Sequence, residues 1–211
     1  AMSKHCTKLI AKDNNISTPN WINIDFRDNN SASLVHTPSY KMKFPIVIKP
    51  DDNGSTIGLS IVQDKTQLEN SINLALQYSS NILFEEYIQG RELTVSILAG
   101  KALPIVEIAP KSGIYDYEAK YSKGKSQYYC PADLSEKITE KIQNDAINIF
   151  NLLGCKHYGR VDFIYNEGKH YMLEINTLPG MTSTSLLPKA AKVAGIPFDK
   201  LLGVIINEAT R

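Results

Sequence analysis

The chain has 211 residues, enough for one large domain or two small ones, and 43% of them are hydrophobic, which supports a buried core. A net charge of +1 gives no indication of a nucleic-acid-binding surface. The cysteines (Cys6, Cys130 and Cys155) lie far apart in no C-x-x-C arrangement, which argues against a disulfide framework or a zinc site and indicates a reducing, cytoplasmic environment. No apolar run approaches a membrane span and no signal peptide is visible, so we expect no membrane as partner. Because of the near-neutral charge we expect no nucleic acid as partner either.

The N-terminal part of the chain predicts one short helix and several strands. The helix is expected over residues 3–13, with Leu9 and Ile10 as its apolar positions. Strands are expected at three apolar or alternating runs: 21–26, 44–50 and 59–62. The middle run is the most apolar and ends in Lys49 and Pro50, so we expect a buried strand with a lysine at its end.

The central part predicts a helix, a run of antiparallel strands and a long polar segment. Asp64 with Gln67 is a capping-box signal for a helix that runs to about residue 78. Strands are expected at 82–88, 93–99 and 103–108. The segment 110–133, rich in tyrosine and lysine, is longer than most loops inside a compact domain, so we expect it to be functional or disordered.

A second capping-box signal, Asp133 with Glu136, predicts a long helix closed by Gly154. Its inner face is expected to consist of spaced apolar residues: Ile138, Ile142, Ile149, Phe150 and Leu153. Two short helices, 186–194 and 198–209, are expected to end the chain. The four histidines show no metal-ligand spacing and are expected at surface or incidental positions. Antiparallel strands with helices on a face are typical of an α+β fold.

A β-hairpin is predicted between the long helix and the last two helices. Its strands are expected over 161–165 and 170–175. The turn between them is expected to be a three-residue loop, Glu167-Gly168-Lys169, in which Gly168 adopts positive φ.

The predicted register of this hairpin gathers polar side chains on one face. It places Asp162 opposite Glu174 and Arg160 opposite Asn176, and Glu174 and Asn176 share a face because strand side chains alternate. Carboxylate and amide oxygens are the hard ligands that hold magnesium on a nucleotide phosphate. The alternative is a solvated hairpin face, but the acidic residues interrupt an otherwise apolar alternation. We therefore interpret Asp162, Glu174 and Asn176 as metal ligands.

Lys49 and the loop behind it indicate a phosphate site. The loop carries Gly54, Ser55 and Gly58, and its backbone N–H groups can cradle phosphates while the lysine supplies charge. The P-loop spacing G-x-x-x-x-G-K-[ST] is absent. Taken alone, a lysine at a strand end such as Lys49 is more often a surface cation, and it is the metal triad that makes the phosphate interpretation specific.

A third group of residues lies at the end of the expected apolar strand 82–88 and just beyond it. Glu85 and Glu86 end it, and backbone groups there can bind a purine edge. Glu92 lies just beyond and can accept hydrogen bonds from ribose hydroxyls. From sequence alone, a solvated strand end explains these carboxylates equally well.

Taken in order along the chain, these residues resemble the D-alanine–D-alanine ligases of the ATP-grasp fold, from about Met2 to the end. The resemblance is carried by five motifs: Ile48-Lys49-Pro50, Gly54-Ser55, Glu118-Ala119-Lys120-Tyr121, Gly159-Arg160-Val161-Asp162, and Glu174 through Ser185. It implies two lobes with mostly antiparallel sheets and flanking helices, a central nucleotide-binding lobe over 1–91 and a C-terminal lobe over 92–211. ATP is expected between the lobes, with a hinge near residues 88–92.

The resemblance also assigns residues to ligands. The nucleotide is expected at seven positions: Lys4, Lys49, Glu85, Glu86, Tyr87, Ile88 and Glu92. The divalent metals, magnesium or manganese and two in number for the family, are expected at Asp162, Glu174 and Asn176.

In the family, ATP phosphorylates the carboxylate of a first D-alanine, and the amine of a second attacks the acyl phosphate to give D-alanyl-D-alanine for peptidoglycan. Arg160 and the N–H of Gly180 match the groups that stabilise the oxyanion. Ser185 with the Leu186 backbone matches the site for the carboxylate of the second D-alanine. Lys120 and Tyr121 match a loop that closes over the site, with Tyr121 of the dipeptide-forming type.

The family also carries an N-terminal lobe that binds the first D-alanine and supplies a glutamate linked to Ser55 and Tyr121, and nothing in the chain matches it. We therefore interpret the chain as the ATP-binding portion of a ligase, expected to bind Mg·ATP and to make little or no dipeptide alone. The resemblance suggests a homodimer for the full-length protein. Two alternatives remain: an ATP-grasp ligase for other amino acids, or a nucleotide-binding module without catalysis.

Overall fold

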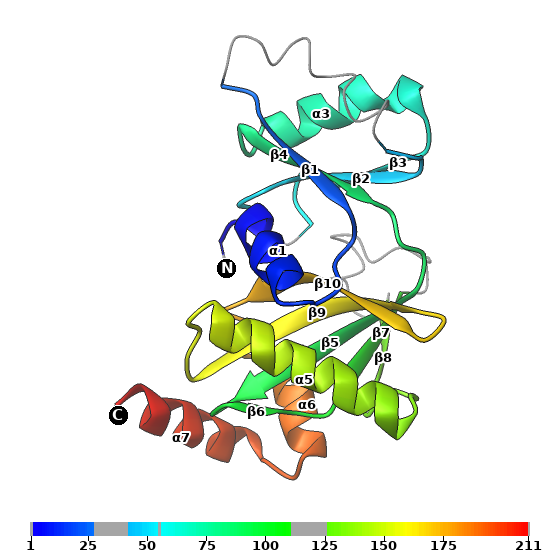
Figure 1. Cartoon of the computed structure of the whole chain (residues 1–211). Helices are drawn as coiled ribbons and strands as arrows, with labels where there is room; N and C mark the ends of the chain where they lie inside the picture. Colours follow the sequence, from blue (N-terminus) through cyan, green and yellow to red (C-terminus); the bar gives the residue numbers. More distant parts are fainter. Residues whose placement is uncertain (1, 28–41, 55, 111–125, 211) are drawn as a thin grey trace.

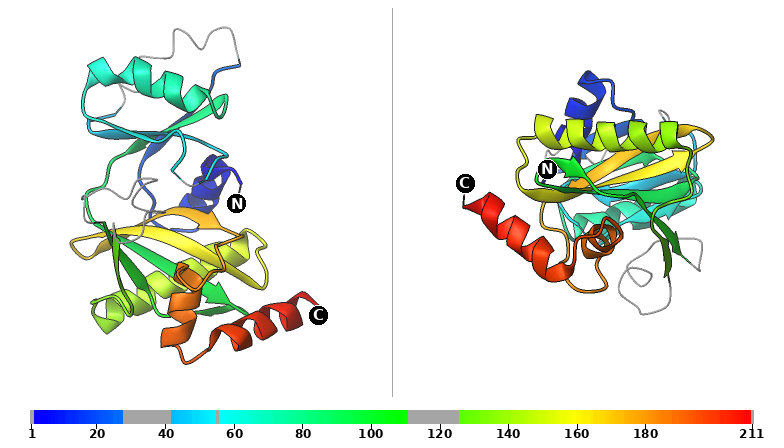
Figure 2. Two further views of the ribbon diagram at one scale, coloured as in Figure 1. Left: turned by 180° about the vertical axis from the view of Figure 1, so that it is seen from behind. Right: turned by 90° about the horizontal axis from the view of Figure 1, so that it is seen from below.

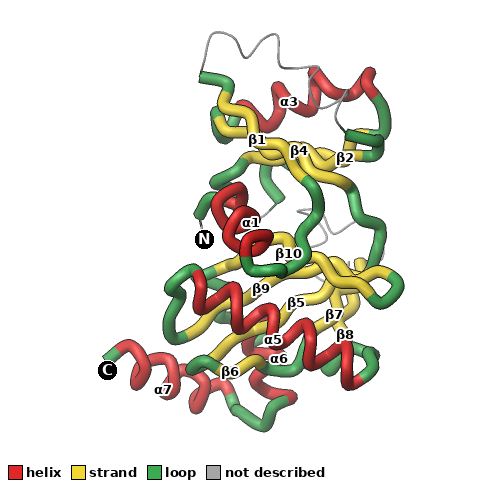
Figure 3. The backbone as a smooth tube through the Cα atoms, viewed as in Figure 1, coloured by secondary structure: helices red, strands yellow, loops and turns green. Residues whose placement is uncertain are grey.

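The computed structural model describes residues 2–27, 42–54, 56–110 and 126–210 (Figure 1). These residues form two lobes, each built on one antiparallel sheet with helices on its faces, and the short helix α1 (Lys4–Asp13) lies between the two sheets (Figure 3). The α+β class predicted from the sequence is confirmed.

The first lobe is a four-stranded sheet covered on its outer face by a helix. The sheet has the order β1-β4-β2-β3, with every pair antiparallel. Its strands are β1 (Trp21–Asp25), β2 (Ile46–Pro50), β3 (Ser60–Val62) and β4 (Asn81–Glu86). The 3-10 turn η2 (Lys65–Gln67) leads into α3 (Leu68–Leu76), whose apolar stripe of Leu68, Ile72 and Ala75 packs on the sheet.

The second lobe is a six-stranded sheet with helices on both faces. The strands follow the order β10-β9-β5-β7-β8, and β6 pairs with β5. They are β5 (Arg91–Leu98), β6 (Lys101–Ala102), β7 (Val106–Pro110), β8 (Ser126–Tyr129), β9 (Tyr158–Asn166) and β10 (Lys169–Asn176). Helix α5 (Glu136–Leu152) covers one face; α6 (Leu186–Val193) and α7 (Phe198–Ala209) lie against the other (Figure 2).

Helix α5 buries most of the predicted apolar stripe, but its N-cap residue lies two positions later than expected. Ile142, Ile149 and Phe150 are buried against the sheet, and Gly154 closes the helix with φ of +66°. The N-cap residue is Ser135, so the predicted cap at Asp133 is wrong. The Asp133 carbonyl instead accepts a hydrogen bond of 3.0 Å from the Arg91 guanidinium, which holds this residue outside the helix.

Helix α1 turns a polar face inward. Its buried residues are Lys4, Thr7, Lys8 and Ala11, whereas Leu9, one of its two apolar positions, is 42% exposed. Positions i, i+3, i+4 and i+7 share one helix face, and here that face meets acceptor groups between the lobes rather than an apolar core.

The change from one sheet to the other falls between Glu86 and Arg91, beside the division predicted at residues 91 and 92. That division places α1 in the first lobe, whereas Ala11 and Ile16 pack in the core of the second. Helix α1 therefore bridges the lobes and positions side chains for the cleft between them.

His170 is a buried residue of the second lobe, not a surface histidine. It is 3% exposed, and its Nε2 lies 2.6 Å from Asp145 Oδ2 of α5. Its ring also makes an edge contact with Phe163, on the sheet face covered by α5. The prediction of a surface position is therefore wrong for His170, because spacing along the chain does not reveal the facing helix. Among the described residues no helix is both long and apolar enough to cross a membrane.

Candidate functional site

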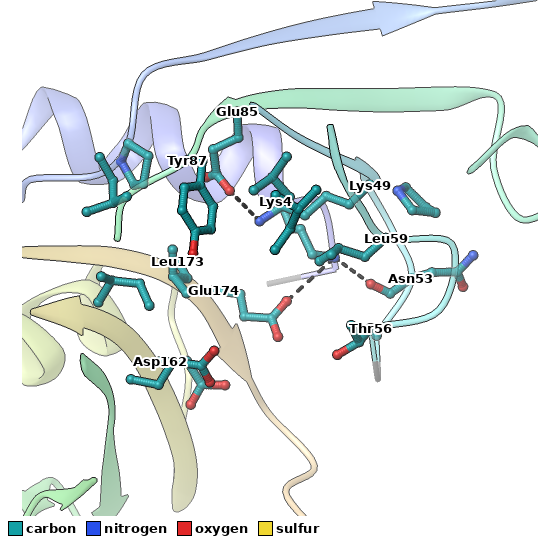
Figure 4. A pocket seen from close by; sticks show the side chains of 18 of the residues that line it. Lys4, Lys49, Asn53, Thr56, Leu59, Glu85, Tyr87, Asp162, Leu173 and Glu174 are labelled. Carbon is teal, nitrogen blue, oxygen red and sulfur yellow. Dashed lines mark hydrogen bonds and ion pairs between the residues drawn. The ribbon is translucent and has the colours of Figure 1, made fainter. Parts of the chain in front are cut away.

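A cavity of about 820 Å³ lies between the two sheets. Both lobes contribute to it, and Figure 4 shows carboxylates of the second lobe and polar side chains of the first pointing into the same space. Many lining side chains are apolar: Val47, Ile57, Leu59, Ile61, Leu74, Tyr78, Tyr87, Ile88, Ile108, Phe163, Ile164 and Leu173. A concave, largely apolar site with a few convergent charges is the usual form of a small-molecule site.

Lys4 enters the cavity from the first turn of α1. Its Nζ donates to the carbonyl oxygens of Asp51 and Asn53 and lies 3.6 Å from Glu174 Oε2. The Asp51 carboxylate accepts from the N–H of His5 at 2.6 Å, so it sits at the positive end of the helix. Burial lowers the pKa of Lys4 from its ordinary value, against the opposing effect of Glu174.

Glu85 is held between two lysines. Its Oε2 lies 2.6 Å from Lys49 Nζ, and its Oε1 forms an ion pair with Lys8. The three side chains are at most 9% exposed. Burial alone would raise the pKa of Glu85, but the two ammonium groups outweigh it and the pKa lies below its usual range. The carboxylate is therefore ionised and fixed in position.

The segment that joins the sheets forms another wall. Tyr87, Ile88 and Gly90 line the cavity, as does Glu92 at the start of β5. Glu92 pairs with Ile164 of β9 on one side and with Ile108 of β7 on the other. Glu86 also lines the cavity.

The predicted pairing of the hairpin is confirmed: Glu174 lies opposite Asp162, and Asn176 opposite Arg160. The predicted turn is wrong. Asn166 pairs with Lys169, so the turn has two residues, Glu167 and Gly168, both with positive φ (47° and 84°), as in a type I′ turn.

A β-bulge between Met172 and Glu174 restores the register. His170 and Met172 are buried on the α5 side of the sheet, and strict alternation would put Glu174 on that side too. The extra residue, Leu173, reverses the alternation, so that Glu174 lines the cavity and Ile175 enters the core. The bulge therefore delivers the second carboxylate to the cleft.

Asp162 is held in position by two neighbours. Its carboxylate accepts two hydrogen bonds from the Arg160 guanidinium, at 2.8 and 2.9 Å, and one from Thr94 Oγ1 at 2.6 Å. Asn176 Oδ1 accepts from the N–H of Leu178 at 3.1 Å, where the chain leaves β10. Thr94 is a residue that the sequence reading missed.

No group of three His, Cys, Asp or Glu side chains suited to a metal ion occurs in the described part of the chain. A metal site here would consist of the facing carboxylates of Asp162 and Glu174 with the amide oxygen of Asn176. These are hard oxygen donors of the kind that magnesium and manganese prefer, so the donor set fits such an ion.

Gly180 and Ser185 lie together beyond β10. A Cβ atom at Gly180 would come within 2.9 Å of Ser185 Oγ. That hydroxyl accepts from the N–H of Thr182 at 3.1 Å, and Ser185 is the N-cap residue of α6, directly before Leu186. None of these residues lines the cavity of about 820 Å³.

The structure thus unites most of the predicted nucleotide and metal residues around one cavity: Lys4, Lys49, Glu85, Glu86, Tyr87, Ile88, Glu92, Asp162 and Glu174. Asn176 and Arg160 adjoin it as cross-strand partners of one another. Ser55, Lys120 and Tyr121 lie outside the described residues. Lys8 was missed; the only sequence signal was its spacing of four from Lys4 on the predicted helix.

The buried state of Lys8 predicts a pH dependence of stability. Burial lowers its pKa from 10.5 to about 8, only partly opposed by Glu85. Between these values the unfolded chain binds the proton and the folded chain does not, so the free energy of unfolding rises with pH, by at most about 1.4 kcal/mol per pH unit. Urea unfolding at pH 7.5, 8.5 and 9.5 is expected to show a smaller rise in Lys8→Met than in the parent.

Lys12→Met, which removes an exposed lysine one turn further along α1, is the control and is expected to keep the slope of the parent. Parallel slopes in the parent and Lys8→Met would contradict the prediction.

Comparison with known proteins identifies relatives along nearly the whole chain. The family model described as "D-ala D-ala ligase C-terminus" matches residues 10–207. The D-alanine–D-alanine ligase of Ruthia magnifica is 44% identical over 210 residues, which cover 98% of this chain and 69% of that protein.

Two solved structures are similar in fold. The crystal structure of the Bacillus anthracis D-alanine–D-alanine ligase has a TM-score of 0.85 at 36% identity, and the same enzyme has been solved in complex with ATP. The structure of the VanG D-Ala:D-Ser ligase from Enterococcus faecalis has a TM-score of 0.87 at 30% identity. The chain spans 67% of the Bacillus protein and 61% of VanG, so part of each has no counterpart in these 211 residues.

Proposed function

Because the chain belongs to the D-alanine–D-alanine ligase family, with the ATP-grasp fold, we propose that it carries the ATP- and metal-binding part of a ligase that joins two D-alanines into D-alanyl-D-alanine for peptidoglycan. One observation supports this most directly. The cavity between the lobes has lysines from the first sheet and α1 on one side and two carboxylates of β9 and β10 on the other.

The two ends of the cavity suit the two ends of ATP. Apolar side chains around Tyr87 and Ile88 suit the purine, and backbone groups of that segment suit its hydrogen-bonding edge. Lys4 and Lys49 suit the phosphates, which ammonium groups bind as point charges. Glu92, which lines the cavity, is assigned to the ribose hydroxyls.

The metal ions are assigned to Asp162, Glu174 and Asn176: Glu174 pairs with Asp162 across the hairpin, and Asn176 lies two residues further along the strand of Glu174. A divalent ion, magnesium or manganese, neutralises charge on the phosphates and polarises the phosphoryl group when bound. Lys4 is 3.6 Å from Glu174, so the first lobe and the metal ligands already make contact.

The reaction needs two further functions from the chain. When the carboxylate of the first D-alanine attacks the γ-phosphorus, ADP leaves and an acyl phosphate forms; the amine of the second then attacks the acyl carbon, and phosphate leaves. Arg160 and the N–H of Gly180 are assigned to stabilise the oxyanion of that second step. Ser185 Oγ and the N–H of Leu186 are assigned to hold the carboxylate of the second substrate.

Ser55, Lys120 and Tyr121 are assigned to the closing of the site over the substrates. The first D-alanine is assigned to a lobe that the relatives possess and these 211 residues do not match, so the chain alone should bind nucleotide and form little dipeptide. We place the reaction in the cytoplasm and expect the full-length enzyme to be a homodimer.

A ligase that joins D-alanine to a different amino acid is the second candidate. The similarity to the VanG D-Ala:D-Ser ligase supports it, because the two proteins share the fold. A nucleotide-binding module without catalysis is less well supported, since both facing carboxylates and Arg160 are in place beside the cavity.

The proposal is tested by thermal unfolding of the parent chain and Glu174→Gln, with ATP in the presence and absence of Mg²⁺. A ligand at one hundred times its Kd stabilises the folded state by about 2.7 kcal/mol. For a chain of this size, that corresponds to a rise in midpoint of about 5–10 °C. The parent is expected to show a magnesium-dependent rise that Glu174→Gln loses.

Glu167→Gln, an exposed carboxylate in the turn of the same hairpin, is the matched control and should respond as the parent does. A parent without any ATP-dependent rise, or a Glu174→Gln variant with the full rise, would overturn the assignment.

A further inference from the structure

Lys8 is a fully buried cation that lies behind the cavity. Its side chain is 0% exposed, and the residues that line the cavity include Glu85 and Lys49 but not Lys8. Lys8 Nζ pairs with Glu85 Oε1, while Lys49 Nζ lies 2.6 Å from Glu85 Oε2. Each oxygen of one carboxylate is therefore occupied by a different ammonium group.

The remaining contacts of Lys8 anchor it in this position. Its Nζ donates to Thr18 Oγ1 at 2.6 Å and lies 5.1 Å from the centre of the Trp21 ring. Thr18 in turn donates to the carbonyl oxygen of Met172 in β10, at 2.7 Å. Lys8 is thus tied to both lobes and does not turn toward a ligand in the cavity.

Lys8, Glu85 and Lys49 form a triad of charged side chains, and its net charge differs from that of a simple ion pair. Two ammonium groups and one carboxylate carry a net charge of +1, whereas Lys49 with Glu85 alone would be neutral. Charge at these distances acts strongly where water is largely excluded. Lys49 is the member of the triad that combines a positive charge with access to the cavity.

We propose that Lys8 is a positioning residue for nucleotide phosphates: by occupying Glu85 Oε1, it leaves Lys49 available as a phosphate-binding cation. The inference rests on the proposed function, because it takes ATP as the ligand. Lys8 touches no ligand and acts through Glu85. Its contribution therefore depends on the phosphates and not on the nucleoside.

The test compares ATP with adenosine, which lacks the phosphates, by isothermal titration calorimetry at fixed Mg²⁺ and ionic strength. The quantity of interest is the Kd for adenosine divided by the Kd for ATP. The variants set the triad charge: Lys8→Met gives 0, Lys8→Arg gives +1, Glu85→Gln gives +2, and Lys8→Met with Glu85→Gln restores +1. A variant that weakens only the nucleoside contact raises both Kd values by the same factor, so this effect cancels in the ratio.

Lys8→Met is expected to lower the ratio on the order of tenfold. Lys8→Arg and the double variant are expected to keep the ratio of the parent, although the double variant binds both ligands more weakly. If Lys8→Met does not fold, Lys8→Gln, which removes the same charge but keeps a polar group for Thr18, takes its place.

An unchanged ratio in Lys8→Met, or an equal fall when Lys8→Met is added to Glu85→Gln, would overturn the role of Lys8 through Glu85 while leaving the proposed function intact. A parent chain that binds adenosine and ATP equally weakly would overturn the phosphate site itself. A purely structural role would weaken both ligands in parallel and leave the ratio unchanged.

Discussion

Replacing Glu85 by glutamine is expected to lower the free energy of unfolding by about 3–5 kcal/mol, the usual cost of removing one partner from a buried ion pair. The Lys8 and Glu85 side chains are 0% and 3% exposed, and Lys49 is 9% exposed. Without the carboxylate, two ammonium groups remain side by side with little water to screen them. Urea unfolding followed by fluorescence of Trp21, the single tryptophan, and by circular dichroism measures the loss.

Glu86→Gln is the matched control. Glu86 is the next residue of β4, and its half-buried carboxylate accepts one hydrogen bond of 2.9 Å from Asn20. It is expected to cost about 0.5–1.5 kcal/mol, the net value of a single hydrogen bond. Lys8→Met combined with Glu85→Gln is expected to cost less than the sum of the two single changes, because their effects are coupled. Equal losses of unfolding free energy in Glu85→Gln and Glu86→Gln would show that the ion pairs of Glu85 contribute no more to stability than a single hydrogen bond.

Gly90→Ala is expected to destabilise the chain by about 1–3 kcal/mol and to weaken adenosine binding on the order of tenfold. A Cβ at this position would lie 2.5 Å from the carbonyl oxygen of Tyr165 and 2.7 Å from Ile164 Cγ2. The Tyr165 backbone belongs to β9 and pairs with Arg91 of β5, so it cannot move aside as a side chain would. The segment with Tyr87 and Ile88 must shift instead, and with it a wall of the cavity.

Gly203→Ala tests whether any glycine replacement has this effect. Gly203 lies within α7, and a Cβ there would meet nothing within 4 Å. Alanine favours the helix over glycine by about 1 kcal/mol, so this variant is expected to be neutral or stabilising and to bind adenosine as the parent does. Calorimetry and urea unfolding of both variants give the comparison. A Gly90→Ala variant that binds adenosine normally would refute the assignment of this wall to the nucleoside.

Local patterns predicted the elements well where periodicity and turn chemistry agree. The apolar run that ends in Lys49 forms β2, and the stripe of Ile142, Ile149 and Phe150 is the buried face of α5. Both depend on side-chain spacing within one element. The predicted cap at Asp133 failed because a partner distant in sequence, Arg91, takes the carbonyl group of that residue.

For the hairpin, the pairing of the two strands was predicted correctly, but the turn and the bulge that produce it were not. Asp162 and Glu174 do face each other, but through a two-residue turn and a bulge, not through a three-residue loop. Turn residues are visible in sequence, whereas a bulge reflects which side chains the opposite layer accepts. His170 and Met172 must face α5, and Glu174 must not, because an unpaired carboxylate is costly to bury.

The buried lysines of helix α1 could not be predicted from the sequence. An apolar stripe predicts a buried face, but the inward face of α1 carries Lys4 and Lys8. Lys8 meets Glu85, which lies 77 positions further along the chain, so no local pattern identifies the contact. Lysines are seldom buried, and this burial is stable because each charge finds a partner.

By itself the sequence determined most of the helices and strands, the α+β class and the chemistry of the donors, because periodicity, turn residues and ligand type are local properties. It did not predict β6, or β8, which lies within the segment 110–133 expected to be a loop. Only the tertiary structure decided which side of each sheet the donors occupy and which cations neutralise them. The bulge in β10 turns Glu174 into the cleft, and the position of α1 between the two sheets brings Lys8 to Glu85. Both depend on the cost of leaving a charge buried without a partner, which is set by packing between segments far apart in the chain.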